Sequence, residues 1–235
     1  MSDPLPESVL AELRELDTPT VCNALEAVAP ERRNQGFTTL PLVCARPELP
    51  PIVGYARTAT IAAMHPSGYS REKAGELRNG YYRYIAEGGP APSVTVIQDL
   101  DAQRGFGAWW GEVNSTVHRG LGSLGVVTDG SIRDLPDCAP GFQLIAGMVG
   151  PSHAHVHVVS YGGEVNVAGM TVRDGDLIHA DQHGAVMIPI AVASEVKAAA
   201  DVIARREAVL IDAARRPGFN FEKLQQAWAD MAEIH

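Results

Sequence analysis

The chain has 235 residues, of which 46% are hydrophobic and 20% are charged, and its formal net charge at pH 7 is −9. This length and composition suit an ordinary buried core, so we expect one folded domain over residues 1–235 rather than a disordered chain. The acidic balance argues against a surface that neutralises nucleic-acid phosphates. The 3 cysteines are widely spaced, which favours neither a disulfide framework nor a cysteine-rich zinc site.

The start of the chain is acidic and proline-rich, without the basic and apolar regions of a secretory leader. No segment reaches the roughly 18 consecutive apolar residues that a membrane-spanning helix requires. We therefore expect a soluble cytoplasmic protein with neither a nucleic-acid partner nor a membrane partner.

Two short helices are predicted near the N-terminus. Apolar residues recur at helical spacing over residues 7–16, and residues 17–19 (DTP) supply a cap and a first-turn proline for a second helix over 21–28. The proline-rich segment 41–51 is predicted to be a loop inside the domain, because a β-rich run over 52–62 follows it at once.

The middle of the chain alternates predicted helices and strands. Residues 70–87 predict a helix, 94–100 a buried strand, 112–121 a second helix and 124–128 another buried strand. A strand, a helix and a strand in this order favour parallel pairing with a right-handed crossover.

The last third of the chain predicts strands followed by helices. Glycine-containing turns separate the strand-like segments 142–147, 155–160, 164–172 and 176–189. An alanine-rich helix over 194–214 and a final short helix end the chain.

The stretch from Gly111 to Asp134 combines a helix start with a turn that carries an arginine and an acid. The first turn of a helix has unpaired N–H groups and the positive end of the dipole, which bind carboxylates. Gly111, before Glu112, lacks the Cβ that would keep a ligand from that backbone. The next strand leads through a turn to Arg133 and Asp134, on the side where ligand crevices of open α/β sheets lie. We therefore expect both pieces to face one pocket.

The residue types in this stretch suit one chemistry. Asp134 is a hard oxygen ligand of the kind that Mg²⁺ or Mn²⁺ prefers, and Arg133 suits a carboxylate or a developing enolate. Glu112 suits proton transfer. However, an Arg-Asp pair after a turn is also common on solvated surfaces, so the spacing alone leaves both interpretations open.

Segments along nearly the whole chain resemble the family of the regulator of ribonuclease E activity A and the 4-hydroxy-4-methyl-2-oxoglutarate aldolases. The similar segments are 16–21 (LDTPTV), 54–59 (GYARTA), 110–112 (WGE), 120–134 (GLGSLGVVTDGSIRD) and 169–189 (GMTVRDGDLIHADQHGAVMIP). Together and in this order they are far more specific than any one of them.

The resemblance implies a metal-dependent lyase that acts on a small 2-oxo acid. In aldolases of this family the aspartate that matches Asp134 holds Mg²⁺ or Mn²⁺, and the arginine that matches Arg133 binds the pyruvyl part and stabilises its enolate. The acid that matches Glu112 orients a water that protonates the enolate, and backbone amides near Val113 and Asn114 hold the substrate carboxylate. Such enzymes cleave 4-hydroxy-2-oxo acids to pyruvate and a second oxo acid, and they often decarboxylate oxaloacetate.

The resemblance also implies the fold and the assembly. We expect an αββα sandwich of the swivelling β/β/α type in a homotrimer or homohexamer, with the site near a subunit interface. Glu207 is our candidate for a contribution from a neighbouring subunit's C-terminal helix. The chain departs from the family pattern at residues 114–116 (NST), around Trp109-Trp110 and at 153–157 (HAHVH), which leaves the identity of the 2-oxo acid open.

Two alternative functions remain. The same family includes a non-catalytic regulator that binds ribonuclease E, but that regulator departs from the pattern at the metal aspartate, whereas Asp134 is present here. An unrelated metalloenzyme is the second alternative, because His153, His155 and His157 on one strand face would suit a transition metal. The simpler interpretation is a strand with histidines that face solvent or substrate.

Overall fold

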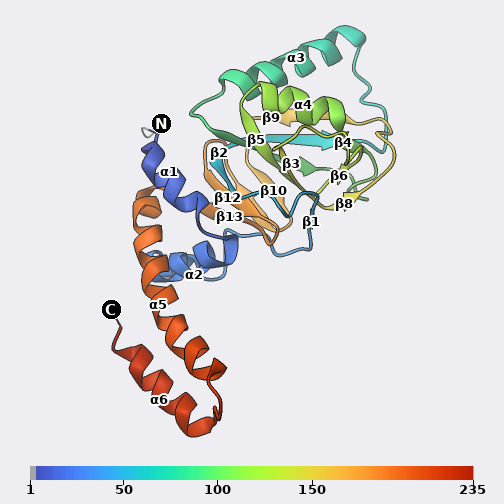
Figure 1. Ribbon diagram of the computed structural model, residues 1–235. Coiled ribbons are helices and arrows are strands. Elements are labelled where there is room, and N and C mark those ends of the chain that lie inside the picture. The colour runs from blue at the N-terminus through green and yellow to red at the C-terminus, as the bar shows by residue number, and fades with distance from the viewer. Residues whose placement is uncertain (1–3, 235) are drawn as a thin grey trace.

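An eight-stranded mixed sheet organises the protein, which we describe from a computed structural model covering residues 4–234 (Figure 1). Residues 1–3 and 235, the ends of the expected domain, lie outside this range. The strand order is β1 (Val43–Cys44), β7 (Gln143–Ala146), β5 (Ser123–Thr128), β3 (Ser93–Asp99), β2 (Ile52–Ala62), β12 (Leu177–Asp181) and β13 (Gly184–Ile188), and β9 (His157–Tyr161) also pairs with β2.

The parallel part of the sheet contains the predicted strand–helix–strand unit. Strands β2, β3, β5 and β7 pair in parallel, and α4 (Glu112–Gly120) connects β3 to β5. Strands β9 and β12 instead run antiparallel to β2. The fold is thus a mixed α/β fold, as the resemblance implies.

Two of the helices illustrate how a polar side chain caps the first turn. In α2 (Thr18–Val28) the Asp17 carboxylate accepts from Thr20 N at 2.9 Å, and in α3 (Arg71–Glu87) the Ser70 hydroxyl accepts from Lys73 N at 3.2 Å. Such caps satisfy N–H groups that a helix leaves unpaired. The other helices are α1 (Glu7–Arg14), α5 (Val196–Arg215), α6 (Phe221–Ala232) and the 3₁₀ turns Pro30–Arg32 and Ile190–Glu195.

Side-chain alternation along the strands divides the core between the two faces of the sheet. In β3, Val94 and Val96 point to the face that the hairpin of β10 (Val165–Val167) and β11 (Met170–Val172) covers. Ile97 points to the opposite face, where it packs with residues of α3 such as Tyr81. A third cluster joins α1, α2 and the start of α5 to β12 and β13. The strands are therefore buried on both faces, which explains their continuous apolar runs.

A second, three-stranded sheet was not predicted, and it carries the candidate site. It consists of the parallel strands β4 (Ala108–Trp110), β6 (Ser131–Ile132) and β8 (Met148–Val149). Residues 109–110 belong to β4, and the helix that follows Gly111 begins at Glu112, where it was predicted to begin. These strands are two or three residues long, too short for their side chains to show a period.

The C-terminal helices form a hairpin that projects from the sheet (Figure 1), and α6 folds back along α5. The buried residues of α5 are Val196 and Ala200, both near its start. The buried residue of α6 is Ala227. None of the helices in residues 4–234 has the length and apolar character needed to cross a membrane.

Candidate functional site

All of the predicted site residues except Glu207 meet where β4 and β6 end. Arg133 N donates to Trp110 O at 2.9 Å, which sets the Arg133–Asp134 turn beside the start of α4. A cavity of about 350 Å³ opens between them. Its walls are Ala108, Trp109, Gly111, Glu112, Val113, Asn114, Arg133, Asp134, His153 and Val156.

The start of α4 presents backbone N–H groups to this cavity. Gly111 is the cap residue, and no side chain in the described part of the chain bonds to the first turn as a cap. The first helical hydrogen bond runs from Ser115 N to Gly111 O at 3.0 Å. The amides of Val113 and Asn114 therefore lie at the positive end of the helix dipole, as an anion site requires.

Gly111 has a second structural role, which the sequence did not reveal. A Cβ at this position would lie 2.6 Å from Asp134 Oδ2, closer than real side chains allow. We expected the glycine to admit a ligand to the backbone. In the structure it also admits the Asp134 carboxylate itself, and it thereby couples the two walls of the cavity.

The opposite wall is a turn with an unusual backbone. Asp134 has a φ of +53°, in the left-handed region, which costs on the order of 1 kcal/mol for a residue other than glycine. Asp137 N and Cys138 N both donate to Asp134 O, at 2.9 and 3.1 Å, and hold this conformation. Arg133 Nε lies 3.5 Å from Asp134 Oδ2, and the two side chains are 35% and 39% exposed. Both charged groups are thus accessible to a ligand in the cavity.

Asn114 supports the helix through its side chain. Its Oδ1 accepts from the Tyr82 hydroxyl at 2.6 Å, and its Nδ2 donates to Trp109 O at 2.5 Å. A direct role for Asn114 in binding a carboxylate therefore rests on its backbone amide. Asn114, where the chain departs from the family pattern, thus connects α4 to α3 and to β4.

His118 extends this support into the core. Its Nδ1 lies 2.7 Å from Asn114 O, a carbonyl that only accepts, so Nδ1 carries the proton and Nε2 accepts from the Tyr81 hydroxyl, also at 2.7 Å. Burial lowers the pKa of His118 to about 4, so the ring is neutral at pH 7. One turn earlier, Ser115 Oγ donates to Glu112 O and accepts from Ala139 N at 2.9 Å. Sequence reasoning identified none of these contacts.

Two buried carboxylates hold the loops that flank the site. Asp129 Oδ1 accepts from Asp99 N at 2.8 Å, and Asp99 Oδ2 accepts from Gly105 N at 2.7 Å. Arg104 Nη1 lies 2.9 Å from Asp129 Oδ2. Burial raises the pKa of both carboxyl groups. They connect the end of β3 to the turn that leads into β6.

The expected arrangement of three histidines on one strand face is wrong. Strand β9 begins only at His157, because the chain turns at Ala154, where φ is +46°. His153 lines the cavity, whereas the His157 ring meets Tyr69 edge-on at 6.1 Å. Among residues 4–234, no group of three or more His, Cys, Asp or Glu residues could hold a metal ion.

The two tryptophans have different positions. Trp109 lines the cavity, whereas Trp110 is fully buried and stacks on Phe142 with ring centroids 5.6 Å apart. Glu207 is exposed on α5 and does not line the cavity of its own chain.

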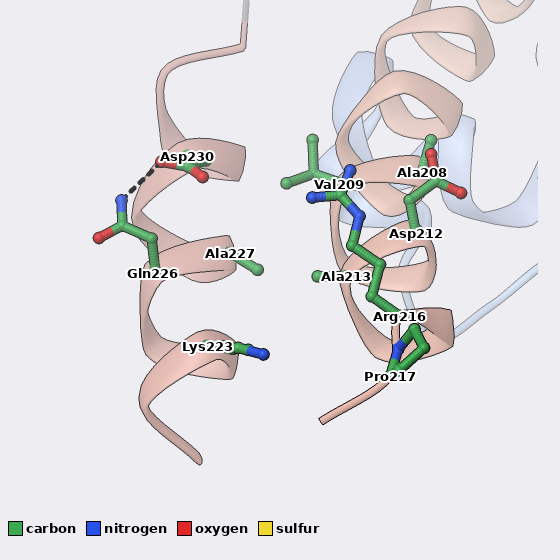
Figure 2. A pocket seen from close by; sticks show the side chains of 10 residues that line it. All are labelled: Ala208, Val209, Asp212, Ala213, Arg216, Pro217, Lys223, Gln226, Ala227 and Asp230. Carbon is green, nitrogen blue, oxygen red and sulfur yellow. Dashed lines mark hydrogen bonds between the residues drawn. The ribbon is translucent and has the colours of Figure 1, made fainter. Parts of the chain in front are cut away.

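A larger groove, of about 610 Å³, lies between α5 and α6 (Figure 2). Its walls combine Ala208, Val209, Ala213 and Ala227 with charged residues such as Asp212. None of the predicted site residues belongs to it. The smaller cavity is therefore the candidate site, because the predicted site residues line it, although the groove is larger.

Comparisons with known proteins agree with this architecture. Among solved structures, an uncharacterised protein from Pseudomonas syringae pv. tomato str. DC3000 is 25% identical, with a TM-score of 0.71, and the match covers 98% of this chain and 97% of that chain. Streptomyces coelicolor RraAS2, described as an unusual member of the RNase ES inhibitor RraA protein family, is 22% identical, with a TM-score of 0.66 and coverage of 92% and 100%.

A third structure, described as S-adenosylmethionine: 2-dimethylmenaquinone methyltransferase from Geobacillus kaustophilus HTA426, is 16% identical. Its TM-score is 0.52, and the match covers 69% of this chain and 91% of that chain. These differing descriptions show that the fold alone does not assign an activity. No curated protein matches the chain.

A family match settles the relationship. Residues 18–187 match the RraA-like family, described as Aldolase/RraA, and this range contains both walls of the cavity. The family includes aldolases and decarboxylases as well as inhibitors of ribonuclease E. The chain belongs to the RraA-like family of aldolases and ribonuclease regulators.

Proposed function

We propose that the protein is a divalent-metal-dependent lyase that cleaves a 4-hydroxy-2-oxo acid to pyruvate and a second oxo compound. Decarboxylation of oxaloacetate, which passes through the same enolate, is the accompanying activity. One observation carries the proposal. The Asp134 carboxylate, with Arg133 beside it, lies against Gly111 at the start of α4, where no side chain of the described residues caps the helix.

The residues present fit Mg²⁺ or Mn²⁺. These ions keep several waters and are commonly bound through one or two carboxylates together with substrate oxygens, whereas zinc sites use several nitrogen or sulfur ligands. Asp134 offers one accessible carboxylate in the cavity, and in residues 4–234 no cage of three protein ligands stands near it. When bound by Asp134, the ion would act as a Lewis acid on the 2-oxo group.

The chain's own groups suit the rest of the substrate. The amides of Val113 and Asn114 would bind the C1 carboxylate at the positive end of α4. The Arg133 guanidinium would donate to the 2-oxo oxygen, where negative charge develops. The Arg133 guanidinium would therefore stabilise the enolate more than the starting ketone.

The reaction balances without an external oxidant or reductant. The C4 hydroxyl gives its proton to the Glu112 carboxylate, directly or through a water, and becomes a carbonyl as the C3–C4 bond breaks and leaves its electron pair in an enolate over C3 and C2. The enolate then takes a proton at C3 and becomes pyruvate. Glu112, on the first turn of α4 and in the cavity wall, would deliver this proton.

A substrate screen tests the proposal. The purified full chain is incubated with 4-hydroxy-2-oxo acids and with oxaloacetate, with added Mg²⁺ or with a chelator, and pyruvate is measured with a coupled dehydrogenase. We expect pyruvate from at least one substrate in the presence of the metal only. A folded protein that forms no pyruvate from any of them, and that retains ribonuclease E in a pulldown, would overturn the proposal in favour of a regulator.

A further inference from the structure

A second cavity, of about 190 Å³, adjoins the candidate site and is not used by the chemistry above. The two cavities share two wall residues, Trp109 and Val156. The two cavities therefore adjoin at Trp109 and Val156.

The walls of the second cavity are mainly aromatic and aliphatic. The Tyr69 ring meets the His157 ring edge-on at 6.1 Å, and Leu77 and Val158 supply aliphatic surface. Arg78 also lines it. Flat aromatic walls with a guanidinium favour a planar apolar ring, which stacks on aromatic residues and interacts favourably with a cation at its face.

The shared wall is held in place. Trp109 O accepts from Asn114 Nδ2 at 2.5 Å, and the Trp109 ring packs edge-on against Tyr81 with centroids 5.9 Å apart. Tyr69, by contrast, is 40% exposed, so this wall of the second cavity is accessible to solvent. The boundary at Trp109 is therefore fixed by its neighbours, whereas the Tyr69 wall is exposed.

We propose that this second cavity binds the substituent on C4 of the substrate and that this substituent is an aromatic ring. The inference rests on the proposed function, with the C1 carboxylate at α4 and the 2-oxo oxygen at Arg133, and it assigns the C4 end of the substrate to the side of Trp109 and Val156, where the two cavities adjoin. Cleavage of the C3–C4 bond then gives an aromatic aldehyde, whose carbonyl forms as the C4 hydroxyl loses its proton, and pyruvate.

The wild-type experiment compares three substrates with added Mg²⁺. The substrate 4-hydroxy-2-oxo-4-phenylbutanoate has a phenyl group on C4, and 4-hydroxy-2-oxopentanoate has a methyl group there. Oxaloacetate has no such substituent and measures the activity of the candidate site alone. We expect kcat/KM to be higher for the phenyl than for the methyl substrate by about tenfold or more, the discrimination typical of an apolar pocket. A preference for the methyl substrate would overturn the inference.

Variants of Tyr69 locate the preference. Tyr69→Ala should lower kcat/KM for the phenyl substrate by about tenfold and change the oxaloacetate rate much less, because one wall of the second cavity is lost. Tyr69→Phe keeps the ring and should keep the preference. Phe221→Ala, which removes a ring 66% exposed on α6, is the matched control.

The outcomes separate the two proposals. Absence of pyruvate from all three substrates means that the proposed lyase function itself fails. Oxaloacetate turnover with no preference for the phenyl substrate, or with a preference that Tyr69→Ala leaves intact, means that the lyase function stands and the aromatic-substituent inference fails.

Discussion

The two walls of the candidate cavity are built in opposite ways. The Arg133–Asp134 wall is a short turn with a left-handed backbone and two side chains more than a third exposed. The α4 wall rests on a buried network in which Asn114, His118 and Tyr81 satisfy one another's hydrogen bonds. The first wall offers reactive groups and the second holds backbone amides at a fixed position. The chemistry and the stability of the site should therefore respond to different substitutions.

The largest effect is expected at the turn. Asp134→Asn keeps the shape of the side chain and a residue type that tolerates left-handed backbone, but it removes the charge that a divalent cation requires. Under the proposed function we expect kcat to fall on the order of 10³-fold, with an unchanged melting temperature. Pyruvate formation and thermal melting measure the two quantities. Full activity in this variant would remove Asp134 from the mechanism.

Sequence reasoning predicted this wall by residue type but not by conformation. The pattern around Arg133 and Asp134 indicated the chemistry, whereas the φ of +53° depends on hydrogen bonds from Asp137 and Cys138 that only the folded turn provides. The long helices and strands were predicted because periodicity accumulates over many residues. Strands β4, β6 and β8 are too short to show it.

The supporting wall was missed for a different reason. Asn114 meets Tyr82 across 32 residues of sequence, and His118 meets Tyr81 across 37. No local pattern indicates such pairs, because α3 and α4 come together only through packing on the same face of the sheet. The sequence showed that Asn114 was unusual for the family, and the structure shows which contacts it makes.

The α4 wall should determine how stability depends on pH. The folded pKa of His118, about 4, lies below its ordinary value of 6.5, so the unfolded chain binds a proton more readily between these values. The contribution of neutral His118 to the free energy of unfolding is complete above pH 6.5 and is lost as the pH falls toward 4. The total loss is about 3 kcal/mol. Urea unfolding at pH 7, 5.5 and 4.5 measures it.

The variant His118→Gln checks the assignment of this pH dependence. It should be less stable at pH 7, because a flexible glutamine reproduces the two ring contacts with the Tyr81 hydroxyl and Asn114 O less well, but it should lose less stability on acidification than the wild type. His179 is also buried with a lowered pKa and acts in the same direction, so part of the slope remains. A variant with the full wild-type slope would show that His118 does not titrate in this range.

Gly111 tests the coupling between the walls. Gly111→Ala places a Cβ 2.6 Å from Asp134 Oδ2, so either the carboxylate or the helix start must shift. A displacement of this kind should lower kcat/KM about 10²-fold for any substrate of the proposed reaction. Gly120→Ala, where an added Cβ meets no atom within 4 Å, is the matched control on the same helix. Equal activity of both variants would separate the two walls functionally.

The smallest expected effect comes from the outermost contact of the supporting network. Tyr82→Phe removes the hydroxyl that donates to Asn114 Oδ1 at 2.6 Å, a loss worth about 1 kcal/mol of unfolding free energy. Tyr84→Phe, on the same helix, removes a hydroxyl bonded to Thr58 N at 2.9 Å and to Asp174, away from the cavity. Tyr84→Phe should lose at least as much stability, because it removes two hydrogen bonds, but only Tyr82→Phe should change kcat/KM, by a few-fold, because Tyr82 bonds to Asn114 at the start of α4 and Tyr84 does not. If the two variants lose the same activity, Asn114 stabilises the fold without positioning the site.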